Sequence, residues 1–171
     1  QRAMSKSSEK PHELTVAVAA GKGGTGKTLV ATSLALALHE LHPGKVQLLD
    51  CDVEEPNASI LLHPEITSAE PVHVLVPQVD LEACIYCGKC AQACQFSAIA
   101  VIRQAVLTFP ELCAGCGACS YVCPQNAIAE VQRAVGELSR GHSAEGIAFV
   151  QGRLTVGDQR ATPVTKAVKK Q

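Results

Sequence analysis

The sequence predicts an α/β fold in which a parallel sheet is interrupted by a small cysteine-rich unit. An apolar run, a glycine-rich loop, a helix-forming stretch and a second apolar run follow one another within about 37 residues, which is the pattern of a βαβ unit. Apolar residues make up 47% of the 171 residues, enough to build a core. Eight of the nine cysteines lie between Cys84 and Cys123. These observations exclude a chain that is disordered throughout.

Charge and hydropathy narrow the range of partners. The formal net charge is −1, from 15 basic and 16 acidic residues, so no basic excess is available to neutralise a nucleic-acid backbone. We therefore expect no nucleic-acid partner. No apolar run approaches the roughly 18 residues that a membrane helix needs, so no stable membrane anchor is expected. Residues 1–13 are polar and lack the apolar core of a signal peptide, which predicts a flexible tail and a cytoplasmic protein.

The elements before the cysteines form the first part of the expected fold, residues 14–79. Leu14–Ala20 is short, apolar and partly β-branched, which suits a buried parallel strand. Lys27–Leu41 consists mostly of good helix formers, and Pro43 and Gly44 end that helix. Val46–Asp50 reads as a second strand.

The remaining elements are shorter. Residues 80–131 hold the cysteines and are expected to form a compact domain of their own, after which residues 132–171 return to the first domain. Outside that unit we expect a helix at Ala58–Leu62, strands at Val72–Val76, Ile147–Val150 and Leu154–Val156, and a helix at Thr162–Lys170.

The cysteines form an internal repeat with an offset of 29 residues. Each copy reads C-x2-C-x2-C-x3-C, the spacing of the bacterial 4Fe-4S run. Three thiolates two residues apart can wrap three corners of a cluster, while the fourth lies on the next helical turn and faces the other cluster. One cluster is therefore assigned to Cys84, Cys87, Cys90 and Cys123, and the second to Cys94, Cys113, Cys116 and Cys119.

Two other readings of these cysteines stay open. Zinc could occupy two four-cysteine sites, although zinc sites usually use two separated cysteine pairs. Disulfides are a weaker alternative because the chain shows no secretory signal.

Residues 80–131 resemble the two-cluster bacterial ferredoxins. The resemblance rests on both cysteine runs and on the proline that follows the second of them, Pro124. The first run departs from that pattern because Gln95 stands where the proline is expected. We expect this change to add an N–H donor beside the second cluster and to raise its reduction potential.

A phosphate-binding loop lies between the first expected strand and the first expected helix. The stretch fits G-x4-G-K-S/T and consists of Gly21, Lys22, Gly23, Gly24, Thr25, Gly26, Lys27 and Thr28. Backbone N–H groups of residues 23–28 would face the β-phosphate, Lys27 would reach the β- and γ-phosphates, and Thr28 would bind Mg²⁺. The alternative is a glycine-rich turn that binds no nucleotide.

The early lysine, Lys22, is similar to that of the deviant Walker A ATPases, which include MinD, ParA, the nitrogenase iron protein and the Mrp-type iron–sulfur carriers. In that family the equivalent lysine reaches the phosphates bound by a partner subunit. The resemblance implies a nucleotide-dependent homodimer or paralogous heterodimer, and it gives Lys22 a catalytic role beside Lys27. A solvated loop lysine is the alternative.

The stretch that ends at Asp50 and Asp52 resembles the second strand of those ATPases running into switch I. The resemblance implies that Asp50 lies near Mg²⁺ through water and that Asp52 orients or deprotonates the attacking water. Either residue could instead be a simple loop carboxylate.

The order of motifs resembles MinD-superfamily P-loop ATPases with an inserted ferredoxin domain, over about residues 14–170. The resemblance implies ATP or ADP, Mg²⁺ and two 4Fe-4S clusters, and a redox partner protein whose electron exchange depends on nucleotide. The sequence reaches Gln171 before a Walker B aspartate, so we expect a partial sheet and expect ATP hydrolysis only if a longer protein supplies that residue. An Mrp-type cluster carrier, a plain ferredoxin with a vestigial loop and a redox-sensing positioning ATPase remain alternatives.

Overall fold

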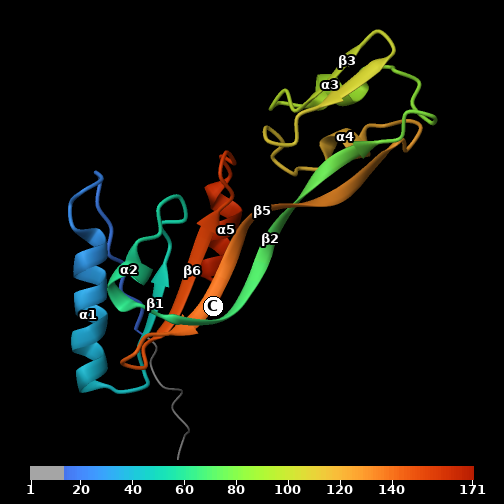
Figure 1. Cartoon of the computed structure of the whole chain (residues 1–171). Coiled ribbons are helices and arrows are strands. Elements are labelled where there is room, and N and C mark those ends of the chain that lie inside the picture. Colours follow the sequence, from blue (N-terminus) through green and yellow to red (C-terminus); the bar gives the residue numbers. More distant parts are fainter. Residues whose placement is uncertain (1–13) are drawn as a thin grey trace, which may run out of the picture.

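The computed structural model describes residues 14–171, so the tail expected at residues 1–13 lies outside the described part. Figure 1 shows two lobes. One lobe holds a four-stranded sheet with its helices, and the other is a smaller unit at the far end of two long strands. We call residues 80–127 the cysteine lobe and the rest of the described chain the sheet lobe. No helix within residues 14–171 is long and apolar enough to cross a membrane.

The sheet lobe is built from three helices and four strands. Strand order across the sheet is β1-β6-β5-β2. The elements are α1 (Lys27–Leu41), β1 (Gln47–Asp50), α2 (Ala58–Leu62), β2 (Glu65–Val79), β5 (Ile128–His142), β6 (Ala148–Leu154) and α5 (Ala161–Val168). Only β1 and β6 pair in parallel, while β5 pairs antiparallel with both β6 and β2. The expected parallel sheet is therefore only partly correct, because the short turn between β5 and β6 forces an antiparallel return.

The helix predictions are largely confirmed. The helices expected at Lys27–Leu41 and Ala58–Leu62 are α1 and α2 with the same bounds. The helix expected at Thr162–Lys170 is α5, which begins one residue earlier and ends at Val168. Of the two short strands expected at Ile147–Val150 and Leu154–Val156, the first lies largely in the single strand β6 (Ala148–Leu154), whereas the second is wrong beyond Leu154, where β6 ends.

The strand predicted at Leu14–Ala20 is wrong. These residues form no strand and are largely exposed, with 87% of Leu14 and 55% of Val16 accessible. An apolar strand gains stability from ladder hydrogen bonds and from burial on both faces. In the described structure β1 pairs with β6, and Leu14–Ala20 joins neither of them.

The strand predicted at Val72–Val76 is too short. It is the middle of β2, which pairs with β5 from Glu65 opposite His142 to Val79 opposite Ile128. The sequence hides this length because β2 contains Pro71 and Pro77 and exposes most of its first half. Proline is tolerated there because β2 lies at the edge of the sheet.

Two cores cover the two faces of the sheet. Phe149 and Leu48 pack with α1 and α2 on one face. Val150, the neighbour of Phe149, packs with α5 on the other face, as strand alternation requires. α5 lies very close to the sheet because Gly152 has no side chain, and a Cβ there would fall 2.9 Å from Val164.

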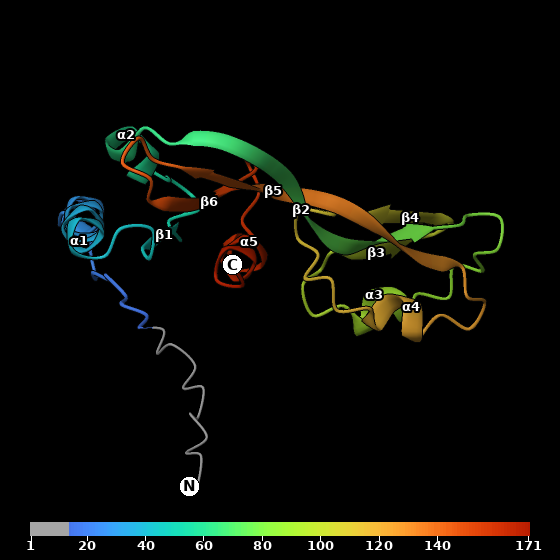
Figure 2. The same ribbon diagram turned by 90° about the horizontal axis from the view of Figure 1, so that it is seen from below.

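The cysteine lobe contains four short elements: α3 (Lys89–Ala93), β3 (Ile99–Ile102), β4 (Ala105–Thr108) and α4 (Ala118–Tyr121). β3 and β4 form a hairpin, and α3 and α4 lie side by side beside it (Figure 2). Each helix begins after a left-handed glycine, Gly88 with φ 77° and Gly117 with φ 71°. The repeated spacing therefore gives repeated local structure.

Candidate functional site

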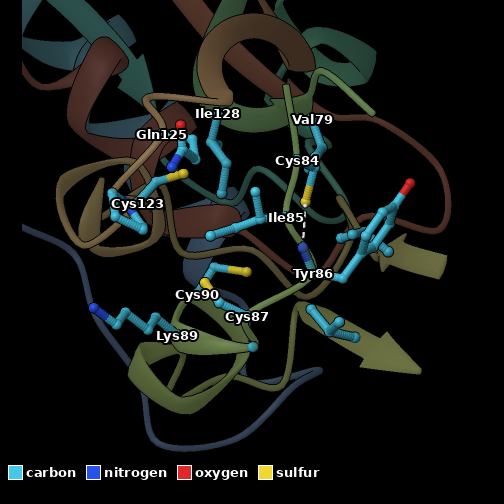
Figure 3. A pocket seen from close by; sticks show the side chains of 14 residues that line it. Val79, Cys84, Ile85, Tyr86, Cys87, Lys89, Cys90, Cys123, Gln125 and Ile128 are labelled. Atoms are coloured by element: carbon cyan, nitrogen blue, oxygen red, sulfur yellow. Dashed lines mark hydrogen bonds between the residues drawn. The ribbon is translucent and has the colours of Figure 1, made fainter. Parts of the chain in front are cut away.

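A first cavity in the cysteine lobe collects three neighbouring thiols and a fourth that is distant in sequence. Cys84, Cys87, Cys90 and Cys123 line it together with the side chain of Ile128. Figure 3 shows three of these cysteines on one stretch of chain and Cys123 entering from the other copy of the repeat. The four residues assigned to one cluster are thus the four that meet here.

A second cavity collects the other four repeat cysteines. Cys94 comes from the first copy, and the three others come from the second copy. The cavity is lined by Cys94, Cys113, Cys116 and Cys119, with Glu130 and Phe96 beside them. Three neighbouring thiols and a fourth from the other copy therefore surround each cavity.

Backbone amides point at the sulfurs in the same way in both copies. The N–H of Tyr86 donates to Cys84 Sγ at 3.4 Å, and the N–H of Gly115 donates to Cys113 Sγ at 3.4 Å. Such bonds favour the thiolate form and raise the reduction potential of a cluster. Burial raises the pKa of Cys90. A metal ligand must be in the thiolate form, so cluster binding here would be accompanied by loss of that proton.

The two alternatives for the cysteines fit less well. All nine cysteines lie within the described residues and all are free, which is against disulfides. Within residues 14–171 no three Cys, His, Asp or Glu side chains approach closely enough to hold one metal ion. A cube with an iron at each of four corners suits thiols spread around a cavity better than a single zinc ion does.

The phosphate loop precedes α1 and is open to solvent. Gly24 (φ 70°) and Gly26 (φ 84°) adopt left-handed backbone conformations that curve the loop, and α1 begins at Lys27. Thr25 Oγ1 donates to the carbonyl of Lys22 at 3.2 Å and fixes the start of the loop. A curved run of amides at a helix N-terminus is a ready site for phosphate.

Two aspartates follow β1 near this loop, with different surroundings. Asp52 Oδ2 lies 3.4 Å from Lys27 Nζ, so the structure brings these two predicted site residues together at an exposed position. Asp50 is buried, and its carboxylate accepts the N–H groups of Asp52 at 3.1 Å and Ala58 at 3.0 Å. Burial raises the pKa of Asp50 above its usual value. In this structure Asp50 holds the loop that carries Asp52.

Sequence reasoning missed a cluster of charged residues between the lobes. Arg160 donates from Nη1 to the carbonyl of Cys113 at 3.0 Å, and Asp158 accepts from Arg160 and lies 3.1 Å from Arg133. Arg160 and Cys113 are 47 residues apart, so no local spacing could have revealed the contact.

Two family models match overlapping parts of the chain. Residues 12–92 match the ParA family, described as the NUBPL iron-transfer P-loop NTPase, and residues 77–130 match a 4Fe-4S dicluster domain. The chain combines a P-loop NTPase segment with a 4Fe-4S dicluster segment. This combination agrees with the lined cavities and the phosphate loop and supports iron–sulfur clusters and nucleotide as ligands.

Curated relatives match parts of the chain. The chain is 34% identical over 88 residues to the uncharacterized protein MJ0578 and 36% identical over 75 residues to the uncharacterized ATP-binding protein MJ0547, both of Methanocaldococcus jannaschii. These matches cover 50% and 44% of this chain, and 30% and 28% of the relatives. The chain is 46% identical over 48 residues to an iron–sulfur protein required for mitochondrial NADH dehydrogenase in Arabidopsis thaliana, covering 28% of this chain and 15% of that protein. The chain thus spans less than a third of each relative's length.

Proposed function

We propose that this chain exchanges electrons through two 4Fe-4S clusters and that nucleotide bound at the phosphate loop controls the exchange. The observation that carries the proposal is the grouping of eight cysteines into two cavities, each closed by one thiol from the other copy. The first cluster is assigned to Cys84, Cys87, Cys90 and Cys123, and the second to Cys94, Cys113, Cys116 and Cys119. When bound, the clusters supply one-electron storage.

The cysteine lobe acts in this proposal as an insertion in a P-loop domain. Its chain leaves the sheet lobe through β2 and returns through β5, and these strands pair from end to end with two register shifts (Figure 1). A continuous two-stranded ribbon is stiffer than a flexible linker. This continuity supports a mechanical connection between nucleotide and clusters.

At the phosphate loop, Lys27 and Thr28 are assigned to the phosphates and Mg²⁺. In the described structure the ammonium of Lys27 faces Asp52 at 3.4 Å. An incoming phosphate competes for that ammonium and releases Asp52, which then becomes available to orient water. Breaking this exposed pair costs little, about 0.5 kcal/mol. The nucleotide can therefore shift the loop that follows β1 with a small part of its binding energy.

Other assignments complete the proposal. Lys22 is exposed on the loop and is assigned to the phosphates of a second subunit in a nucleotide-dependent dimer. A redox protein supplies or accepts the electrons. With eight thiolates and two oxidised cluster cores the charge falls from −1 to roughly −5, so a basic patch on that partner is expected.

Anaerobic EPR of the reduced protein, with and without Mg-ATP, tests this function. We expect signals of 4Fe-4S clusters that change when Mg-ATP is added. Lys27→Met is the control, because it removes the phosphate contact and leaves the cysteine lobe intact. A spectrum of the unaltered protein that is indifferent to Mg-ATP refutes nucleotide control and leaves a plain electron carrier.

A second candidate function is delivery of clusters to other proteins. One observation favours it: Cys87 and Cys116, one ligand of each proposed cluster, are exposed and open to exchange with an acceptor thiol. Incubation of the loaded protein with an apo-ferredoxin separates the two functions. Transfer faster than spontaneous cluster loss supports delivery, and no transfer supports electron exchange.

A further inference from the structure

Arg160 joins the sheet lobe to the second cysteine copy. It lies immediately before α5, and its Nη1 donates to the backbone carbonyl of Cys113 at 3.0 Å. Cys113 is buried and lines the second cavity. Among residues 14–171, no side chain donates to the matching carbonyl of Cys84. The contact is therefore one difference between two cavities that are built from the same repeat.

Asp158 holds the guanidinium of Arg160 in place. Arg160 Nε lies 2.9 Å from Asp158 Oδ1, and Nη2 lies 2.7 Å from Oδ2. The Asp158 side chain is 1% exposed, and its Oδ2 also lies 3.1 Å from Arg133 Nη1. Paired bonds of this kind fix both position and orientation. Two guanidiniums share one carboxylate, which leaves about one unit of positive charge beside the loop of Cys113.

Acidic groups also face this region. Glu111 interacts with the charge of Arg160, and Glu130 lines the second cavity. The positive charge of Arg160 stabilises the reduced cluster, which carries more negative charge, and Glu130 has the opposite effect. Removing the charge of Arg160 and removing the charge of Glu130 should therefore change the reduction potential of the second cluster in opposite directions.

A chain of contacts connects this cluster of charges with the phosphate loop. Asp52 faces Lys27, and the next residue, Val53, accepts the N–H of Leu154 at 2.7 Å. Leu154 is the last residue of β6, and the turn after it leads to Asp158, whose N–H donates to Thr155 at 3.0 Å. These contacts form a path from the Asp52 loop, through the last residue of β6 and the turn after it, to the Asp158–Arg160 pair.

We propose that Arg160 is a positioning residue that holds the Cys113 loop, raises the reduction potential of the second cluster, and makes that cluster the one that responds to nucleotide. This inference rests on the proposed function. It adds to it by assigning nucleotide control to one of the two clusters and to one side chain outside both sites.

The test uses the full chain loaded with clusters under argon. EPR-monitored redox titration gives the two reduction potentials with and without Mg-ATP, and paramagnetically shifted NMR signals of the cysteine β-protons assign each potential to a cavity. Arg160→Gln should lower the second potential by about 59 mV, a tenfold change in the equilibrium constant for one electron, and leave the first unchanged. Glu130→Gln should raise the second potential. Arg140→Gln, which breaks an ion pair with Glu70 elsewhere on β5, should change neither.

The nucleotide response provides the second measurement. In the unaltered protein Mg-ATP should shift the second potential more than the first, and Arg160→Gln should remove the difference. Loss of iron from the second cavity alone in Arg160→Gln also supports a positioning role. In that case Arg160→Lys, which keeps the charge and loses the paired geometry, should retain the iron with a smaller fall in potential.

Two results would overturn the inference. In the first, Arg160→Gln shifts both reduction potentials equally, or shifts neither, while the unaltered protein still responds to Mg-ATP. This result contradicts the inference and leaves the proposed function standing. The other is an unaltered protein that binds two clusters and Mg-ATP without any change in potential, which removes the proposed function and the inference together.

Discussion

The two copies of the cysteine run have the same spacing and the same turns, yet their surroundings differ. Tyr86 in the first copy and Gly115 in the second occupy equivalent positions, with φ of 54° and 67°. Tyr86 points its hydroxyl toward the carbonyl of Leu81 at 3.4 Å within its own lobe. Gly115 lies against β2, where a Cβ would be 2.9 Å from the carbonyl oxygen of Leu75. Local sequence fixes the turn, and the neighbouring lobe decides which residue can occupy it.

The largest expected effect concerns the exchange of ligands between copies. Cys123→Ala changes the second copy but should empty the first cavity, because Cys123 lines that cavity. We expect loss of about half the iron and of the NMR signals of Cys84, Cys87 and Cys90, since metal binding and local folding are coupled. Cys51→Ala, outside the repeat, is the control. Loss of the Cys113 signals instead would contradict the crossed assignment.

Placing the residue of one copy at the equivalent turn position of the other should change stability by unequal amounts in the two copies. Gly115→Tyr adds left-handed strain of about 1–2 kcal/mol and a backbone clash with Leu75, so we expect a total near 3 kcal/mol. Tyr86→Gly removes the strain and one hydrogen bond and should change stability by less than about 1 kcal/mol. The two variants are compared by unfolding them in guanidinium under argon. The measured quantity is the denaturant concentration at which half of the visible cluster absorbance is lost. Equal losses in the two variants would contradict the asymmetry.

Asp158→Asn tests whether the second copy depends on the charges between the lobes. The side chain of Arg160 holds the pKa of Asp158 below its usual value. The folded chain therefore binds this proton less readily than the unfolded chain, and the stabilisation exists above the unfolded pKa of about 3.9. It is lost as the pH falls through the lower pKa of the folded state.

At pH 7 we expect Asp158→Asn to lower the free energy of unfolding by about 2 kcal/mol, because hydrogen bonds to charged groups are strong. The difference in urea midpoint between the two proteins should be constant down to about pH 5 and shrink below about pH 4. A difference in urea midpoint that grows as the pH falls would contradict the lowered pKa of Asp158.

The smallest effect is expected at Gln95, which stands where Pro124 stands in the second copy. Cys94 before it is already extended, with φ −82° and ψ 105°, which is the conformation that a following proline requires of its neighbour. Gln95→Pro should stabilise the chain by less than about 1 kcal/mol and slightly lower the potential of the second cluster by removing an N–H group. An unchanged potential in the redox titration would remove this explanation for the substitution.

The sequence predicted the local elements of the fold better than its long-range strand pairing. The glycine-rich loop, the helix at Lys27–Leu41 and each run of three cysteines depend on residues close together, whose spacing limits what the chain can reach. The failures concern long-range pairing. Leu14–Ala20 has the composition of a strand but finds no partner strand in the described structure, and β2 extends through prolines and exposed residues because β5 pairs with it.

The amino-acid order by itself predicted the three-cysteine runs, the phosphate loop and the helices, because each follows from backbone reach and side-chain preference within a few turns of chain. Tertiary structure alone decided the 15-residue ribbon that joins the lobes, the close packing at Gly115 and the contact between Arg160 and Cys113. These features depend on residues tens of positions apart, and their energies exist only once the sheet has brought those residues together.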